Sequence, residues 1–387
     1  MGRRAALLIA SAVLAIGAGA LLAAVAGSWR FHDLLCFYQG GQAVLRGIDP
    51  YDVHAWQVIT GDPARAIGSQ IVATPCPSAF AYPYWTALAF APLALLPFDV
   101  AAGVWGALLV VGIAAGVGLT VRATGAPALL LAAVTLGSLP LAQVLVFGQL
   151  TGVLLPLAAL SLLPPSARAG ASAGLLALKP QLGALYSVAL LWRAGRRGDV
   201  RFIAALATVL AVLAAVSLAV FPSWPLEWGR EILGGRLELA RLLPTAWGLS
   251  VAVFGNAAWG AAAVALLVAV ALLLARGRKI DHLAFGAIVL AISLFATPHV
   301  AAYDQLFLVV PWAVVLAAAE RRAPAERRVL LASVVVVAVV LPWALLVLQS
   351  RSDTLNAVVP ALTALLATVA QPPAAGARTR AAPPSPG

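Results

Sequence analysis

The chain has 387 residues, of which 63% are hydrophobic and only 10% are charged. A soluble globular domain carries about 25% charged residues, and apolar runs of 18 or more residues recur throughout this chain, so the composition excludes a soluble fold and predicts an all-α polytopic membrane protein. The formal net charge of +11 does not indicate nucleic-acid binding, because the basic residues gather in short loops between the apolar runs, where the positive-inside rule places them.

The apolar runs predict about twelve transmembrane helices, within a range of 10 to 13. The first run covers residues 5–27; Ala24 and Ala26 resemble a signal-peptidase site, but the length of the run favours a retained helix. The segment 148–192 is the weakest, because Lys179-Pro180 interrupts it, and a re-entrant pair of half-helices there would change the count. The other spans are expected at residues 79–97, 100–121, 126–147, 150–164, 170–192, 201–221, 250–275, 283–297, 303–319, 329–348 and 355–371.

The distribution of arginine predicts the topology. Three strongly basic loops are separated by even numbers of spans and are therefore all expected in the cytoplasm: residues 193–201, 276–279 and 321–328. The outer side then holds residues 28–78, 222–246, 298–303 and 349–354. Residues 1–371 are expected to form one integral membrane domain, followed by a disordered cytoplasmic tail at 372–387 that is rich in Pro, Ala and Arg.

Two of the outer loops are long. Residues 28–78 have mixed charge and are expected to form short surface helices. Residues 222–246 have apolar residues at helical spacing, which together with Trp224, Trp228 and the following Trp247 predicts a helix lying in the interface with its tryptophans at headgroup level. Both cysteines, Cys36 and Cys76, fall in the first loop; they can pair in an oxidising compartment, but the sequence does not give their separation.

Asp33 is the first candidate for chemistry. It follows the first apolar run by about five residues, so it is expected near the membrane surface, where a carboxylate is costly unless it is paired or used. The alternative interpretation is a solvated loop residue. Asp49 and Asp52 are explained locally, because Asp49-Pro50 indicates a turn.

Lys179 is one of only two lysines in the chain and lies inside an apolar segment. Such a charge should pair or face a polar cavity, and Pro180 opens the helix at the same place, an arrangement that suits a phosphate ligand. We expect Lys179 to line a cavity, and its replacement by Met to leave membrane insertion intact. The alternative is a lysine that snorkels near a helix end.

A third cluster lies in residues 296–304, where His299, Tyr303 and Asp304 fall within six residues on the predicted outer side. His299 can bind an anion or move a proton; the alternative is a loop whose polar residues only turn the chain. Gln149 follows a glycine between two spans and can donate a hydrogen bond to a sugar hydroxyl. Walker, dinucleotide-binding, HExxH and nucleophile-elbow motifs are missing, and no acidic metal cluster is evident, so neither a cofactor nor a metal is predicted.

Four short motifs, in this order, resemble the polyprenyl-phosphate-dependent glycosyltransferases of family 87, which have the C-type membrane glycosyltransferase fold. Asp33 precedes AVLRGIDPYD in the first outer loop, and AYPYWTALAFAPLALLPF opens the second span. FGQLTGVLLPLAAL and AGASAGLLALKPQ follow, the latter closed by a basic cluster. The resemblance extends over about residues 5–320, and the family includes mannosyltransferases that act on glycolipids.

The resemblance implies an inverting transfer of a sugar, with mannose the leading candidate, from a polyprenyl-phosphate donor to a lipid-linked or glycan acceptor at the outer face of the bacterial plasma membrane. In that mechanism Asp33 is the base, Lys179 and His299 bind the donor phosphate, and Gln149, Tyr303 and Asp304 contact substrate. Asp304 is the rival base. Membrane lipids are the other partners, and no nucleic acid is expected.

Two other classes compete with this interpretation. A transporter or flippase for a lipid-linked or amphipathic substrate would also use broken helices and charges within the membrane. However, the polar residues gather towards one face, and no internal repeat is evident. A structural subunit without activity would leave Asp33, Lys179 and His299 without a shared purpose. The proximity of these three side chains discriminates between the classes.

Overall fold

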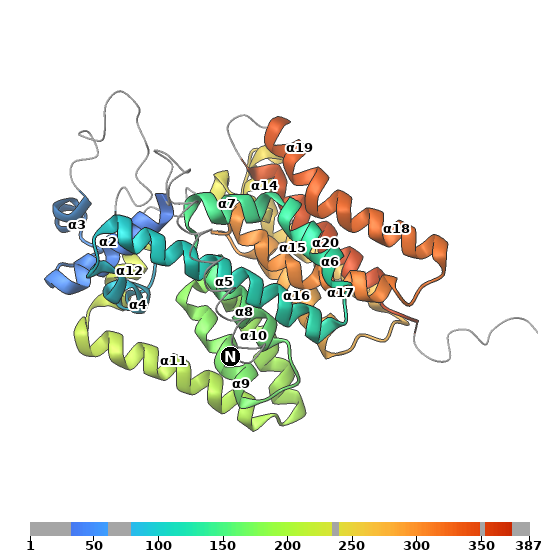
Figure 1. Cartoon of the computed structure of the whole chain (residues 1–387), viewed down its shortest axis with the longest axis horizontal. Coiled ribbons are helices and arrows are strands. Elements are labelled where there is room, and N and C mark those ends of the chain that lie inside the picture. Colours follow the sequence, from blue (N-terminus) through green and yellow to red (C-terminus); the bar gives the residue numbers. More distant parts are fainter. Residues whose placement is uncertain (1–31, 61–78, 234–239, 349–352, 374–387) are drawn as a thin grey trace, which may run out of the picture.

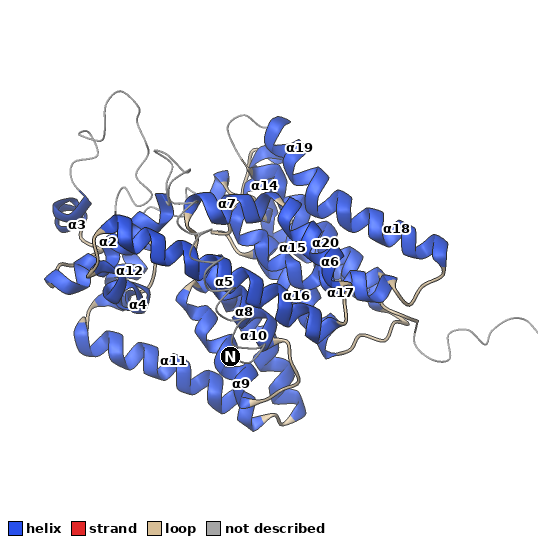
Figure 2. Cartoon of the chain, viewed as in Figure 1, coloured by secondary structure: helices blue, strands red, loops and turns tan. Residues whose placement is uncertain are grey.

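The computed structural model describes residues 32–60, 79–233, 240–348 and 353–373, and this part of the chain is helical throughout (Figure 2). No strand occurs in it beyond an isolated bridge between Arg278 and Pro373. The predicted first helix at 5–27, and the tail apart from Pro372 and Pro373, lie outside the described residues. The prediction of an all-α protein is thus confirmed for the described residues.

Within the described residues, four helical stretches are long and apolar enough to cross a membrane: α5 with Phe98–Thr124, α11 with Val200–Val220, η6–α17 with Ala302–Ala319, and α18–α19 with Pro324–Leu348. The number rises to six if each of two bent helix pairs counts as one span. The apolar helices mark a membrane-embedded protein, but the predicted twelve spans and the C-type fold are not confirmed.

Breaks in the apolar runs explain much of this difference. One run is divided into α6 (Ala128–Gly137) and α7 (Leu139–Phe147), which are bent by 62° at Ser138, with Pro140 in the first turn of α7. A second run is divided into α14 (Ala246–Phe254) and α15 (Trp259–Ala275), bent by 118° after Gly255, whose φ of 69° ends α14 in the left-handed conformation. Hydropathy counts such a run as one span and does not register the bend.

The weak segment 148–192 is also broken, as the sequence indicates. It forms α8 (Thr151–Ser161), α9 (Ala167–Leu175), a short 3-10 turn η3 (Leu176–Leu178) and α10 (Pro180–Arg197). Lys179 lies at the break, with Pro180 as the first residue of α10, a position where proline costs no hydrogen bond.

Small residues let these helices approach closely, as they do in membrane proteins generally. A Cβ added to Gly112 of α5 would lie 2.8 Å from the carbonyl oxygen of Gly152 in α8, and one added to Gly170 of α9 would lie 2.1 Å from the carbonyl oxygen of Phe202 in α11. The first contact joins α5 to α8 and the second joins α9 to α11, which lies along the lower edge of the molecule in Figure 1.

The first long loop contains α2 (His32–Arg46) and α3 (Val53–Thr60), which confirms helices there. α2 is not a surface helix, however: Leu34 and Phe37 are fully buried, and Phe37 stacks on Phe90 of α4 (Tyr84–Ala94) with ring centroids 4.8 Å apart. Cys36 is disulfide-bonded, and Cys76, the only other cysteine of the sequence, lies outside the described residues.

The second long loop forms α12 (Trp224–Glu231) and the turn η5 (Ala240–Leu242). The two tryptophans of α12 pack against other parts of the protein. Trp224 is buried edge-on against Trp85, and the indole N–H of Trp228 donates to the carbonyl oxygen of Ala81. These contacts hold α12 against α4 and the segment before it, and its position at the membrane interface stays a prediction.

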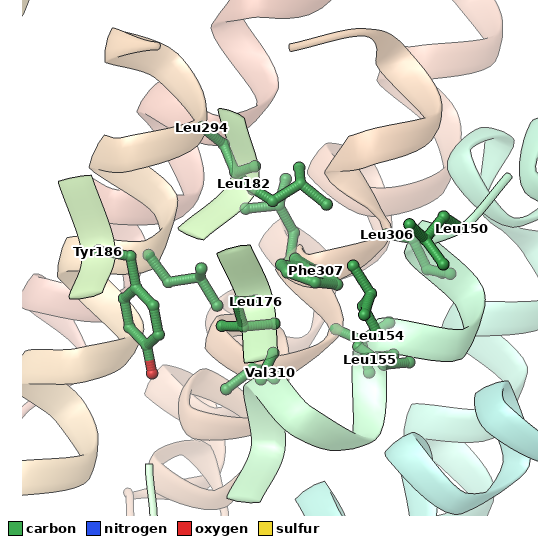
Figure 3. Packing of buried hydrophobic residues seen from close by; sticks show 14 of the residues in the cluster. Leu150, Leu154, Leu155, Leu176, Leu182, Tyr186, Leu294, Leu306, Phe307 and Val310 are labelled. Atoms are coloured by element: carbon green, nitrogen blue, oxygen red, sulfur yellow. The ribbon is translucent and has the colours of Figure 1, made fainter. Parts of the chain in front are cut away.

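Later in the chain lie α16 (His282–Ala296), the 3-10 turn η6 (Ala302–Leu308) with α17 (Val309–Ala319), and η8 (Thr354–Ala357) with α20 (Val358–Val369). α18 (Pro324–Val335) and α19 (Leu341–Leu348) are joined by the π-helical turn η7 (Val336–Val340) along one side of the molecule (Figure 1). η6 and α17 are almost entirely buried. Figure 3 shows how leucines of α8, η3, α10 and η6 surround Phe307 in the core.

The three basic loops lie together at one end of these helices. The Arg278 and Arg322 guanidinium groups both donate to the carbonyl oxygen of Gln371, at distances of 2.7 and 2.9 Å. The Arg193 guanidinium, from the predicted basic loop 193–201, lies over the ring of Phe285 in α16, which begins three residues after Lys279. We call this region, with Arg193, Arg278 and Arg322, the arginine end.

Candidate functional site

A cavity of about 520 Å³ lies at the opposite end of the same helices. α10 runs from Pro180 at the cavity to Arg197, and its 18 residues span about 27 Å. Side chains of α12, η5 and the segment before α4 give the cavity an apolar wall that includes Trp228, Leu242 and Leu243. Its polar wall comes from α2, the segment before α4, α10, the loop between α16 and η6, and η6 itself. The polar residues are Asp33, Cys36, Tyr82, Gln181, Thr297, His299 and Tyr303.

Asp33 reaches this cavity because α2 is amphipathic. The buried Leu34 and Phe37 fix the rotation of the helix against α4, and Asp33 is left on the face that borders the cavity. Its position in the first turn also favours a carboxylate, since the backbone N–H groups at a helix N-terminus are electropositive. The alternative of a solvated loop residue is wrong, because Asp33 is helical and lines the cavity.

Lys179 does not line the cavity, although the sequence predicted that it would. Its side chain is fully buried behind the polar wall. The ammonium group donates to Gln149 Oε1 at 2.7 Å, to Asp304 Oδ1 at 2.6 Å and to Thr151 Oγ1 at 3.3 Å. It also lies 4.8 Å from the centroid of the Tyr303 ring, a cation–π contact. The snorkelling alternative is likewise wrong, because the charge points into the protein.

The backbone explains why the lysine points inward. η3 ends at Leu178, and Lys179 has φ −134° and ψ 81° outside any helix before α10 begins. This extended residue directs its side chain between α8 and η6 and away from the lipid. A continuous helix would place position 179 on a helix face, so the break is what allows the burial.

Asp304 is also buried, with 1% of its surface exposed, and does not border the cavity. Oδ1 accepts hydrogen bonds from Lys179 and from the hydroxyl of Thr151, the latter at 2.6 Å, and Oδ2 accepts from the backbone N–H of Ala301 at 3.1 Å. Asp304 therefore balances the charge of Lys179 and caps η6. This geometry gives no support to the predictions that Asp304 contacts substrate or acts as a rival base.

Gln149 connects the buried pair to the cavity. Its carbonyl oxygen accepts from Lys179, and its amide nitrogen donates to Asp33 Oδ2. The side chain is fully buried, so a direct bond to a sugar hydroxyl has no support here. Gly148 precedes it in the left-handed conformation with φ 69° and holds the sharp turn between α7 and α8 through its carbonyl oxygen, which accepts from Trp105.

Two predicted residues line the cavity wall here: His299 from the loop between α16 and η6, and Tyr303 from the first turn of η6. The Tyr303 hydroxyl interacts with the Asp33 carboxylate while its ring covers the Lys179 ammonium. The three residues named as a test of proximity, Asp33, Lys179 and His299, thus lie around one site, two of them on its surface and Lys179 behind it.

Asp49 and Asp52 have the local roles that the sequence suggested. Asp49 Oδ1 accepts from the backbone N–H of Tyr51 at 2.8 Å, and Asp52 Oδ1 accepts from Ala55 at 2.8 Å at the start of α3. Burial raises the pKa of Asp49 above its ordinary value, although the hydrogen bond from Tyr51 opposes the shift. Burial also raises the pKa of the Tyr51 hydroxyl, which donates to the carbonyl oxygen of Tyr82 and ties this loop to the cavity wall.

Sequence reasoning missed several residues of the site. Thr151 lies within FGQLTGVLLPLAAL, but a threonine two residues after the glutamine gave no separate signal. Gln181 and Thr297 line the cavity through contacts between distant segments, which a linear pattern cannot give. Among the described residues, no group of three or more His, Cys, Asp or Glu side chains is placed to hold a metal ion.

The fold and the cavity define the class: an integral membrane protein with an acid-bearing polar site at one end of its helices. The model of Glycosyltransferase family 87 matches residues 80–311, more than half of the chain. The chain therefore belongs to glycosyltransferase family 87 and is a glycosyltransferase. The matched region holds Gln149, Lys179 and the 296–304 loop, whereas Asp33 precedes it. No curated protein and no solved structure matches the chain.

Proposed function

We propose that the protein is an inverting glycosyltransferase of the C-type fold that moves a sugar, in the first instance mannose, from a polyprenyl-phosphate donor to a lipid-linked or glycan acceptor. The reaction takes place at the outer face of the bacterial plasma membrane. One observation carries the proposal: a carboxylate, Asp33, borders a cavity of about 520 Å³ in a member of a glycosyltransferase family.

In the proposed step Asp33 is the general base. The acceptor hydroxyl loses its proton to the Asp33 carboxylate while its oxygen forms a bond to the anomeric carbon of the sugar. The bond from that carbon to the phosphate oxygen breaks, and its electron pair leaves with the polyprenyl phosphate. General base catalysis of this kind contributes a factor of about 10²–10⁴ to the rate.

The phosphate side of the cavity is assigned to His299 and to the first turn of α10, where Pro180 and Gln181 line the wall. A histidine can donate to a phosphate oxygen, and a helix N-terminus favours an anion. The ammonium group of Lys179, one layer behind, adds a positive charge that Asp304 largely neutralises.

An apolar groove beside the cavity supports a lipid-linked substrate. It has a volume of about 300 Å³, runs between α9, α10 and α11, and shares Pro180, Ala184 and Trp228 with the cavity. A substrate with a hydrocarbon chain and a charged head can place its two parts in these adjoining spaces. The runner-up, a transporter or flippase, would use the same groove, but membership of a glycosyltransferase family favours transfer.

The test is a transfer assay with purified protein in liposomes. Labelled polyprenyl-phosphate mannose and extracted membrane acceptors are supplied, and label is followed into the acceptor. Wild type is expected to transfer label, Asp33→Asn to lose a factor of about 10²–10⁴ in rate while remaining folded, and Asp52→Asn to stay close to wild type. A folded Asp33→Asn protein with near-normal turnover would refute the assignment of the base. Movement of intact donor across the bilayer without transfer would favour the flippase.

The orientation is tested by labelling single introduced cysteines with an impermeant maleimide in a variant without Cys36 and Cys76. A cysteine in loop 193–201 is expected to react only after the membrane is opened, because the arginine end is assigned to the cytoplasm. Labelling of that loop in intact cells would reverse the topology and move the cavity to the inner face.

A further inference from the structure

Lys179 has no hydrogen-bond donor left for a substrate. An ammonium group has three N–H donors and no acceptor. All three donors have acceptors inside the protein: Gln149, Thr151 and Asp304. The side chain is fully buried, and the Tyr303 ring lies between it and the cavity. Direct binding of a donor phosphate would require this network to open.

The same geometry fixes the orientation of Gln149. The two ends of a carboxamide have nearly the same shape, so hydrogen-bond partners decide which way it points. Because Lys179 can only donate, the atom that it contacts at 2.7 Å must be the Gln149 oxygen. The amide nitrogen is then left to face Asp33.

The orientation of Gln149 in turn selects one form of Asp33. An amide N–H can only donate, so the Asp33 oxygen that it contacts must accept. Both oxygens of an ionised carboxylate can accept in this way, whereas the hydroxyl of the protonated acid is a donor, so the contact favours the ionised form. In the opposite orientation the amide oxygen would face Asp33 and would favour the protonated acid, which cannot take a proton from an acceptor. Lys179 thus controls Asp33 through one intervening side chain.

Asp304 and Thr151 keep this arrangement stable. Asp304 Oδ1 lies 2.6 Å from the ammonium nitrogen and compensates its buried charge. The Thr151 hydroxyl donates to the same oxygen, and the Ala301 N–H occupies the other. The pair is therefore held from α8, from the break before α10 and from η6.

We propose that Lys179 is a positioning residue, which orients the Gln149 carboxamide so that it presents Asp33 to the cavity as a proton acceptor. This inference rests on the proposed function insofar as Asp33 is the base, but the hydrogen-bond relay itself does not depend on the identity of the donor. It replaces the predicted contact between Lys179 and the donor phosphate.

The test compares two routes that break the relay. Gln149→Met keeps the length of the side chain and removes both polar ends. The double variant Lys179→Met with Asp304→Asn removes the ion pair without leaving a buried charge unpaired. Ser161→Ala is the matched control, because Ser161 is also a buried hydrogen-bonded residue of α8 but contacts Tyr186 instead of the relay.

Both relay variants are expected to lower kcat by about 10–100-fold, the usual cost of removing a partner that orients a functional group. The acid limb of the pH–rate profile should move to higher pH, and KM for the donor should change by less than about threefold. A variant that combines all three changes should be no slower than Gln149→Met alone, because both routes remove the same relay. The groups that face Asp33 in the cavity, Tyr82, His299 and Tyr303, remain in place in every variant.

Infrared difference spectroscopy of the reconstituted protein gives a readout that needs no substrate. The Asp33 carboxylate band is identified by its absence from Asp33→Asn. As the pH is lowered, this band should be lost at a higher pH in the relay variants than in wild type or Ser161→Ala. An unchanged titration of this band in Gln149→Met would overturn the proposal, even if the double variant failed to fold. A large rise in donor KM with an unchanged acid limb would also overturn it and return Lys179 to the phosphate. If the band shifted in the relay variants but the wild-type protein transferred no sugar, the relay would be supported and the proposed function refuted.

Discussion

The two ends of the molecule hold their positive charges in different ways. At the cavity end, one lysine is fully buried and bonded to side chains, with a carboxylate 2.6 Å away. At the arginine end, Arg278 donates to the carbonyl oxygens of Leu274, Val369 and Gln371, and Arg322 to those of Ala370 and Gln371. Cations on the last carbonyls of α15 and α20 complement the helix dipoles and remain near water. The buried pair depends on each partner, whereas the arginines share acceptors and can substitute for one another.

The largest expected effect on stability is that of Lys179→Met alone. It leaves the Asp304 carboxylate buried without its cation, and breaking a buried pair in this way costs about 3–5 kcal/mol. The folded yield in detergent and the thermal midpoint should both fall sharply. This outcome opposes the sequence-based expectation that methionine would leave insertion intact because it removes a buried charge. The lysine pattern alone did not show the partner.

The double variant Lys179→Met with Asp304→Asn separates the two explanations. It should recover most of the lost stability, because no uncompensated charge remains in the interior. If the double variant were as unstable as Lys179→Met, the damage would come from lost packing around the methionine, and the comparison between the two ends would lose its basis.

At the arginine end, Arg278→Gln should cost less, about 1–2 kcal/mol, because Arg322 still bonds to the carbonyl oxygen of Gln371. Transfer by the folded protein should be unchanged, since the site lies at the other end of α10 and α16. The measurement is a thermal unfolding curve beside a transfer assay at one temperature well below the midpoint. A loss of tenfold or more in rate without unfolding would show that the two ends are coupled.

The elements that could be predicted are those that depend on local pattern. The membrane class, the break at Lys179-Pro180, the helices of the first long loop and the local roles of Asp49 and Asp52 all follow from composition, proline and turn chemistry. The number of spans could not be predicted in the same way, because hydropathy does not distinguish a straight span from α6 and α7 or from α14 and α15.

In the candidate site, too, the residues marked by a local pattern could be predicted and the contacts between distant segments could not. Asp33, His299 and Tyr303 were found because polar residues beside apolar runs stand out in the sequence, and the structure brings them to one cavity. The burial of Lys179 and Asp304 could not be found, because their contact joins residues 125 positions apart. The contacts of the two tryptophans of α12 were missed for the same reason, since their partners belong to α4 and to the segment before it.

The smallest expected effect is that of Asp49→Asn, a carboxylate close to the cavity that takes no part in the relay. Its turn should survive, because an asparagine oxygen can accept from the Tyr51 N–H as the aspartate does. Burial raises the pKa of Asp49 above 3.8, so the folded state holds the proton more tightly than the unfolded state does, and ionisation costs some stability at neutral pH. The asparagine variant should therefore be as stable as wild type or slightly more so at pH 7, within about 0.5 kcal/mol. This small advantage should vanish as the pH falls through the raised pKa and wild type becomes neutral at this position.

Thermal midpoints of Asp49→Asn and wild type at pH 7 and near pH 4, with transfer rates at pH 7, are the measurements. A strong loss of transfer in Asp49→Asn would mean that the first long loop supplies a second carboxylate to the reaction. Asp33 could then no longer be assigned as the only base.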